Sequence, residues 1–131
     1  MNVARSGTNK RILIVDDDTL TSDMYKYALS HVGYTVDIVT GGHEGQLELN
    51  SGKYDLVLLD LMLPDLNGSK ILAKWRQANP LHTRPSIIVL TNYDQEESSR
   101  KLLEKAADAY VVKASTTPRK LLKLIASILD K

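Results

Sequence analysis

The chain has 131 residues, of which 43% are hydrophobic, and its 17 basic residues nearly balance its 16 acidic ones, for a net charge of +1. This composition favours one folded domain with no general attraction to nucleic acid or to an anionic membrane surface. The absence of cysteine excludes disulfides and thiolate metal sites, and no apolar run approaches the ~20 residues that span a bilayer. Residues 1–9 lack the apolar core of a signal peptide, so we expect a flexible N-terminal arm there and a single cytoplasmic domain over residues 10–131, with no membrane or direct nucleic-acid contact.

Five short apolar runs predict buried β-strands, because continuous apolar character rich in β-branched residues is typical of strands covered on both faces. We expect these strands at residues 11–15, 35–40, 56–60, 86–90 and 109–112. Each run is followed by a stretch with helical spacing or a helix-start signal, at residues 19–32, 41–49, 69–78, 94–106 and 118–129. This alternation predicts an α/β fold: a doubly wound five-stranded parallel sheet flanked by five helices, flavodoxin-like (βα)5.

The spacing of apolar residues within the predicted helices indicates which side of each helix is buried. The first helix is expected to bury one face made of Leu20, Met24, Tyr27, Ala28 and His31. The third helix is expected to face inward with Ile71, Leu72 and Trp75.

Four of the five predicted strands end in residues that can do chemistry. These residues are Asp16 and Asp17 after the first strand, Asp60 at the end of the third, Thr91 after the fourth and Lys113 after the fifth. Each has a plainer explanation when taken alone, as a helix cap, a turn residue or a surface lysine. Parallel topology, however, brings these strand ends to one edge of the sheet, where open α/β sheets bind their ligands.

Three carboxylates at this edge would repel one another, by roughly 4 kcal/mol per pair at ~4 Å and an effective dielectric constant of ~20. Lys113 and a divalent cation would offset this repulsion, and ligands made of oxygen alone favour Mg²⁺. A carboxylate beside Mg²⁺, a hydroxyl and a lysine is suited to phosphoryl transfer. Asp60 would then attack in line and form an aspartyl phosphate.

Five motifs resemble those of the receiver domain of two-component response regulators. They are ILIVDDD at residues 12–18, LLDLMLP at 58–64, NG at 67–68, VLT at 89–91 and ADAYVVK at 107–113. The resemblance spans about residues 10–129, nearly the whole chain. It implies a phosphorylation-controlled signalling switch with no metabolic substrate, and therefore not a metabolic enzyme.

The resemblance also implies a role for each matching site residue. Asp60 takes a phosphoryl group from a sensor histidine kinase or a histidine phosphotransfer protein, and Thr91 and Lys113 bind the phosphoryl oxygens. The implied Mg²⁺ ligands are Asp16, Asp17, Asp60 and the backbone carbonyl of Met62.

Thr91 and Tyr110 are the switch residues that the resemblance implies. Thr91 moves toward the phosphoryl group and Tyr110 rotates inward. These movements reshape the face built by the fourth helix, fifth strand and fifth helix. The implied partner of this face is a downstream protein or effector domain, or a second copy in a phosphorylation-linked homodimer.

The sequence departs from the family pattern beside two of these residues. Ala114 follows Lys113 where the family has a cis proline, and because a non-proline cis bond costs ~2.5–4 kcal/mol, a trans bond is expected here. Asn92 replaces the usual small residue after Thr91.

Two other functions stay open at this point. A Mg-dependent aspartyl-phosphate phosphatase of the haloacid dehalogenase type shares the nucleophilic aspartate, but it needs a second acid two residues later, where this chain has Met62. A phosphorylation-independent interaction domain with a receiver-like fold is the other alternative. The intact set of strand-end residues argues against it, whereas Ala114 leaves it room.

Overall fold

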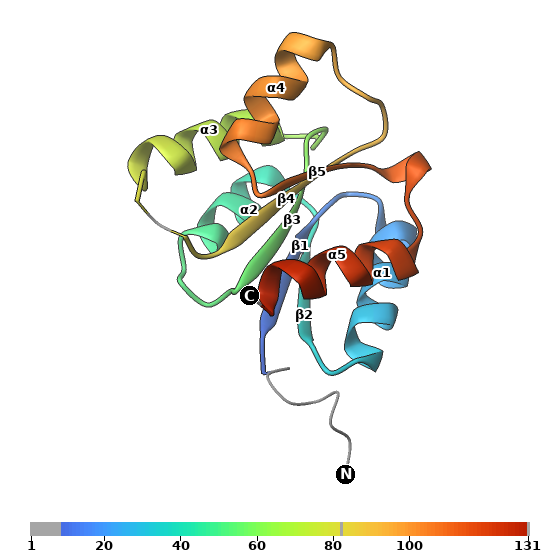
Figure 1. Ribbon diagram of the computed structural model, residues 1–131. Helices are drawn as coiled ribbons and strands as arrows, with labels where there is room; N and C mark the ends of the chain where they lie inside the picture. The colour runs from blue at the N-terminus through green and yellow to red at the C-terminus, as the bar shows by residue number, and fades with distance from the viewer. Residues whose placement is uncertain (1–8, 82, 131) are drawn as a thin grey trace.

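The computed structural model describes residues 9–81 and 83–130, which form one parallel sheet covered by helices on both faces (Figure 1). The strands lie in the order β2-β1-β3-β4-β5. They are β1 (Arg11–Val15), β2 (Thr35–Val39), β3 (Leu56–Asp60), β4 (Ser86–Thr91) and β5 (Ala109–Val112). The predicted arm over residues 1–9 lies outside the described residues, apart from Asn9.

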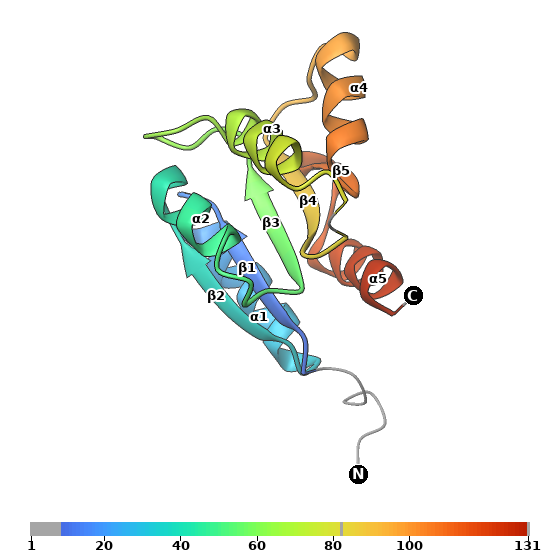
Figure 2. The ribbon, with the colours of Figure 1, turned by 90° about the vertical axis from the view of Figure 1, so that its left-hand side faces the viewer.

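Five helices connect and follow the strands. They are α1 (Thr19–His31), α2 (Gly42–Leu49), α3 (Gly68–Ala78), α4 (Glu97–Ala106) and α5 (Pro118–Leu129). Helices α1 and α5 cover one face of the sheet, and α2, α3 and α4 cover the other (Figures 1 and 2). The predicted doubly wound (βα)5 fold is therefore confirmed. Within the described ranges, no helix has both the length and the apolar character needed to cross a bilayer.

The central strands divide their side chains between two cores. In β1, Leu13 and Val15 join the core under α2, α3 and α4, whereas Ile12 and Ile14 join the core under α1 and α5. The same alternation holds in β3 and β4, and nearly every residue of these strands is buried. This burial on both faces explains the continuous apolar runs in the sequence.

The predicted buried face of the first helix is wrong. Leu20 and Tyr27 are 82% and 70% exposed, and α1 instead buries Ser22, Tyr25 and Leu29. Tyr25 and Leu29 pack in the same core as Leu121 and Ile125 of α5, so this contact decides which side of α1 faces inward. The prediction for the third helix is confirmed, because the three expected residues are buried in α3.

Candidate functional site

The pairing of β1 with β3 places two carboxylates next to each other at the carboxyl end of the sheet. Val15 pairs with Leu59, so the residues that follow, Asp16 and Asp60, lie side by side. Both are buried, with 0% and 2% of their surface exposed, whereas Asp17 is exposed. One oxygen from each of the three carboxylates can be chosen so that all three lie within 4.8 Å of one another.

Lys113 enters this group from the end of β5, and its side chain is only 8% exposed. Its Nζ lies 2.5 Å from Asp16 Oδ2 and 3.5 Å from Asp60 Oδ2. Burial alone would lower the pKa of Lys113, but the hydrogen bond and charge of Asp16, together with Asp60, outweigh it and raise the pKa. The lysine is therefore a fixed ammonium group between two carboxylates.

The alanine at position 114 is compatible with this placement of the lysine. Among the described residues the cis peptide bond is Arg84–Pro85, so the Lys113–Ala114 bond is trans, as the sequence predicts. Residues Lys113–Ser115 form a short 3₁₀ turn after β5. The turn directs the ammonium group toward Asp16 without the cis bond.

Asp60 is the carboxyl group whose ionisation is most strongly affected by its surroundings. Burial, followed by the negative charge of Asp16, raises the pKa of Asp60 to about 6. The Met62 N–H, which donates to Asp60 Oδ1 at 3.1 Å, and the charge of Lys113 oppose this shift. The carboxylate form of Asp60 thus becomes more favourable when further positive charge is close.

The carboxylate cluster fits a hard divalent cation. Its donors are all oxygens, one of the three carboxylates is open to solvent, and a single ammonium group balances only part of the negative charge. Such a donor set suits Mg²⁺, which is usually bound through one or two carboxylates and keeps several water ligands. The predicted residues Asp16, Asp17 and Asp60 are therefore able to hold this ion together.

The turn after β3 is held close to Asp60 by two residues whose roles the sequence did not reveal. The Gly68 N–H donates to the Leu61 carbonyl at 2.8 Å, and a Cβ at Gly68 would overlap the Asp60 carbonyl oxygen. Asp65 accepts hydrogen bonds from the N–H groups of Gly42 at 2.6 Å and His43 at 3.0 Å. These bonds lower the pKa of Asp65 and tie the turn to the first residues of α2.

Thr91 lies at the end of β4 and is fully buried, but the hydrogen bonds of its hydroxyl go to the loop that follows. The hydroxyl donates to the Tyr93 carbonyl at 2.8 Å and accepts from the Gln95 side-chain amide at 3.3 Å. Thr91 is thus near the predicted site in the sheet, with its hydroxyl engaged elsewhere.

Tyr110 is bonded to the same loop. Its hydroxyl donates to Asp94 Oδ1 at 2.9 Å and accepts from the Gln95 N–H at 2.8 Å. Burial is the main cause that raises the pKa of Tyr110 above its ordinary value, which favours the protonated phenol. Gln95 contacts both predicted switch residues, and no sequence motif singled it out.

The sequence is similar to those of known response regulators. The sequence model of the response regulator receiver domain matches residues 12–126. The chain is 40% identical over 103 residues to the transcriptional regulatory protein QseB of Escherichia coli O157:H7, covering 79% of this chain and 46% of that protein. It is 38% identical over 103 residues to the transcriptional regulatory protein CusR of Escherichia coli K12, covering 79% of this chain and 44% of that protein. The chain spans about half the length of these curated relatives.

Two solved structures share the fold and more than 30% of the aligned sequence with this chain. A CheY-like response regulator receiver domain protein from Methanospirillum hungatei superposes with a TM-score of 0.79 at 39% identity, covering 92% of this chain and 94% of that one. The response regulator TrrA from Thermotoga maritima, crystallised in complex with Mg²⁺-BeF, gives a TM-score of 0.77 at 34% identity, covering 91% of this chain and 98% of that one.

Proposed function

Because the chain belongs to the response regulator receiver domain family, we propose that it is a phosphorylation-controlled switch whose phosphoacceptor is Asp60. The phosphodonor is a sensor histidine kinase or a histidine phosphotransfer protein, and the setting is the cytoplasm. One observation carries the proposal: Asp16, Asp17, Asp60 and the ammonium group of Lys113 converge at the carboxyl edge of the sheet.

In the proposed reaction, an oxygen of Asp60 attacks the phosphorus of a phosphohistidine. The new O–P bond forms as the N–P bond breaks, and the imidazole leaves with the electron pair of that bond. Lys113, already 3.5 Å from Asp60, binds a phosphoryl oxygen, and the Thr91 hydroxyl binds another after it leaves its present partners. Burial of Asp60 keeps bulk water away from the product.

Mg²⁺ is the proposed cofactor of this reaction. Asp16, Asp17, Asp60 and the backbone carbonyl of Met62 would hold it, and its charge would neutralise phosphoryl oxygens during transfer. The structure of the relative TrrA in complex with Mg²⁺-BeF supports this assignment by analogy.

The proposed output surface is the face formed by α4, β5 and α5. Tyr110 of β5 connects this face to the loop after β4, so a change at Thr91 has a route to it. The curated relatives are transcriptional regulators, and the matched region covers 46% and 44% of their length. We propose that the partner is an effector domain or a separate downstream protein, or a second copy in a phosphorylation-linked homodimer.

Phosphatase activity of the haloacid dehalogenase type is disfavoured at this site. A leaving group would need an acid two residues after the nucleophile, and Met62 occupies that position with 59% of its surface exposed. A phosphorylation-independent interaction domain is also disfavoured. Burying a lysine between two carboxylates costs desolvation free energy and adds little to stability, so a purely structural role does not explain it.

Intact-mass spectrometry tests the proposed function. Wild type incubated with acetyl phosphate and Mg²⁺ should gain the mass of one phosphoryl group, and should gain none when EDTA replaces Mg²⁺. Asp60→Asn should gain none in either condition. A wild-type protein that stays unmodified with acetyl phosphate and with histidine-phosphorylated donor proteins would overturn the proposal in favour of the interaction domain.

A further inference from the structure

The loop between β4 and α4 contains one residue that is bonded to both predicted switch residues. We infer that Gln95 is a positioning residue that latches Thr91 and Tyr110 together in the unphosphorylated protein. This inference rests on the proposed function, because the latch matters only if Thr91 must reach a phosphoryl group on Asp60.

The first half of the latch holds Thr91. The Gln95 Nε2 group donates to Thr91 Oγ1 at 3.3 Å and to the Tyr93 carbonyl at 3.0 Å. The Thr91 hydroxyl also donates to the Tyr93 carbonyl at 2.8 Å and accepts from the Tyr93 N–H at 3.3 Å. A hydroxyl has one proton and two acceptor positions, so all three are in use. Thr91 can therefore donate to a phosphoryl oxygen only by giving up its bond to Tyr93.

The second half of the latch holds Tyr110. The main-chain N–H of Gln95 donates to the Tyr110 hydroxyl at 2.8 Å, and the same hydroxyl donates to Asp94 at 2.9 Å. Both bonds come from consecutive residues of one loop. A loop movement that frees Thr91 thus also changes the partners of Tyr110.

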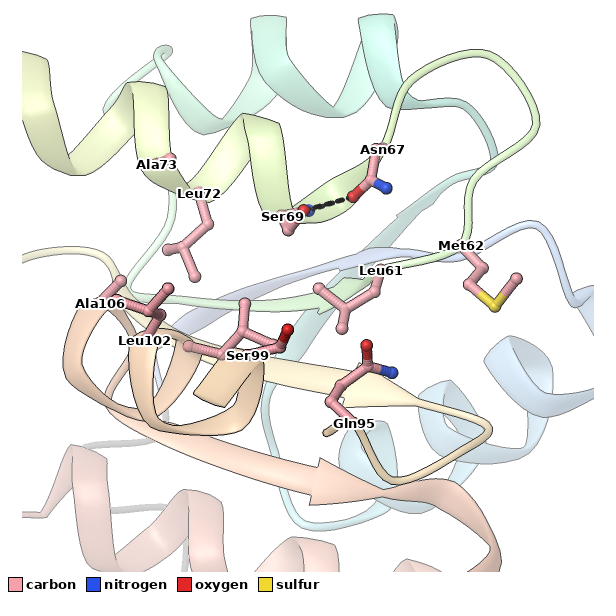
Figure 3. A pocket seen from close by; sticks show the side chains of 11 residues that line it. Leu61, Met62, Asn67, Ser69, Leu72, Ala73, Gln95, Ser99, Leu102 and Ala106 are labelled. Carbon is pink, nitrogen blue, oxygen red and sulfur yellow. Dashed lines mark hydrogen bonds between the residues drawn. The ribbon is translucent and has the colours of Figure 1, made fainter. Parts of the chain in front are cut away.

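The surroundings of Gln95 leave room for this movement. Its side chain lies on the wall of a pocket of about 450 Å³ between α3 and α4, together with Leu61 and Met62 from the turn after Asp60 (Figure 3). Residues 96–99, at the start of helix α4, are exposed, and Leu103, the buried residue of this helix, comes later in it. Displacement of the loop and of the start of α4 therefore breaks few apolar contacts.

The latch explains how two separate hydroxyls can respond as one unit. Each of its bonds is ordinary in strength, and together they favour the arrangement in which Thr91 faces the loop. A phosphoryl group on Asp60 offers Thr91 a charged acceptor, which is a stronger partner than a neutral carbonyl. The equilibrium then moves toward the arrangement in which Gln95 has released both residues.

The test compares Gln95→Met with Glu96→Met. Methionine keeps the length of the glutamine side chain and the main-chain N–H, but it removes the amide donor to Thr91. Glu96 is an exposed neighbour whose side chain makes no capping hydrogen bond to α4, so its substitution controls for a new methionine in the loop.

Amide NMR spectra of the free proteins supply the main readout, with wild type plus Mg²⁺ and BeF₃⁻ as the reference for the activated form. The peaks of Thr91, Tyr93 and Tyr110 in free Gln95→Met should move part of the way toward their activated positions, whereas Glu96→Met should match free wild type. The rate constant for phosphorylation by acetyl phosphate should rise about fivefold in Gln95→Met, the factor that corresponds to one ordinary hydrogen bond.

The outcomes separate the latch from the proposed function. If wild type responds to BeF₃⁻ and acetyl phosphate but Gln95→Met has the free wild-type spectrum and rate, the latch is wrong and the switch stands. If wild type responds to neither reagent nor to a histidine-phosphorylated donor, both are wrong. Should Gln95→Met not fold, the side-chain amide peaks of Gln95 in wild type decide. They must shift on addition of Mg²⁺ and BeF₃⁻, and unchanged peaks overturn the latch.

Discussion

At the residue scale, burial and the negative charge of Asp16 make the ionised carboxylate of Asp60 unfavourable when no metal is bound. Its pKa of about 6 means that the native protein holds a proton there more tightly than the unfolded chain does, where a typical aspartate has a pKa of ~3.9. The ionised form at neutral pH therefore lowers the stability of the free protein. The same imbalance favours the arrival of a cation at the site.

We expect Asp60→Asn to stabilise the metal-free protein at about pH 8, by up to about 3 kcal/mol, and much less at about pH 4. The reason is the direction of the shift. A raised carboxyl pKa gives stability at low pH that is lost as the pH rises from ~4 through about 6, and asparagine cannot ionise. Urea unfolding in EDTA at the two pH values measures the difference.

Asp65→Asn is the matched control, because the pKa of Asp65 is shifted in the direction opposite to that of Asp60. The N–H groups of Gly42 and His43 lower the pKa of Asp65, so its contribution is present above the unfolded pKa and is lost as the pH falls through the lower, folded one. This variant should be less stable than wild type at about pH 8, and the difference in the free energy of unfolding should become smaller toward about pH 3. If Asp60→Asn raised the free energy of unfolding by the same amount at all pH values, the raised pKa of Asp60 would not be the cause of the stabilisation.

At the element scale, the junction between β3 and α3 positions Asp60. The chain turns so tightly that the first residue of α3, Gly68, lies against the main chain at Asp60 and Leu61. Asn67 caps α3 by accepting a hydrogen bond from the Ser69 N–H at 2.8 Å. The sequence marks this junction with Asn and Gly, but only the structure shows that the space beside Gly68 is too small for a Cβ.

Gly68→Ala should destabilise the protein by about 1–3 kcal/mol, because the added methyl group overlaps main-chain atoms that cannot move independently. Gly41→Ala is the control, since a Cβ at Gly41 would meet only the Asp65 side chain, at an ordinary contact distance of 3.4 Å. Urea unfolding of both variants is the measurement. Equal stabilities of the two variants would show that the junction is looser than described.

The elements differ in how well their sequences predict them. The central strands and their last residues are predictable because burial on both faces requires continuous apolar runs, and the run in β3 ends at Asp60. The buried side of α1 is not predictable from spacing, because apolar residues such as Leu20 and Tyr27 also occupy its exposed side. The position of Gln95 is not predictable either, since its bonds depend on a loop with no repeating pattern.

At the scale of the whole molecule, the edge of the sheet formed by the carboxyl ends of the strands differs from the edge formed by their amino ends in how its acidic groups are paired. At the carboxyl edge, three carboxylates lie together, and Lys113 pairs with two of them, Asp16 and Asp60. At the amino edge, Asp55 is paired with donors, because it binds the Arg84 side chain and accepts a hydrogen bond from the Arg11 N–H. The nearly neutral total charge hides this asymmetry, which appears only when the fold is known.

Hydrogen exchange should follow the distribution of buried contacts over the molecule. We expect the amides of α4 to exchange faster than those of α5, because α4 buries one residue and α5 packs two buried residues plus several half-buried ones against the sheet. The slowest amides should lie in β1, β3 and β4, whose residues are almost all buried. Exchange measured by mass spectrometry or NMR tests this order, and protection of α4 equal to that of α5 would contradict it.

The most direct test of the central claim locates the phosphoryl group within the chain. Wild type treated with acetyl phosphate and Mg²⁺ is reduced with borohydride, which converts an aspartyl phosphate to homoserine, and its peptides are then sequenced by mass spectrometry. The account predicts homoserine at position 60 and aspartate at positions 16 and 17. Homoserine at another position, or an unchanged residue 60 in protein that has gained a phosphoryl group, would contradict it.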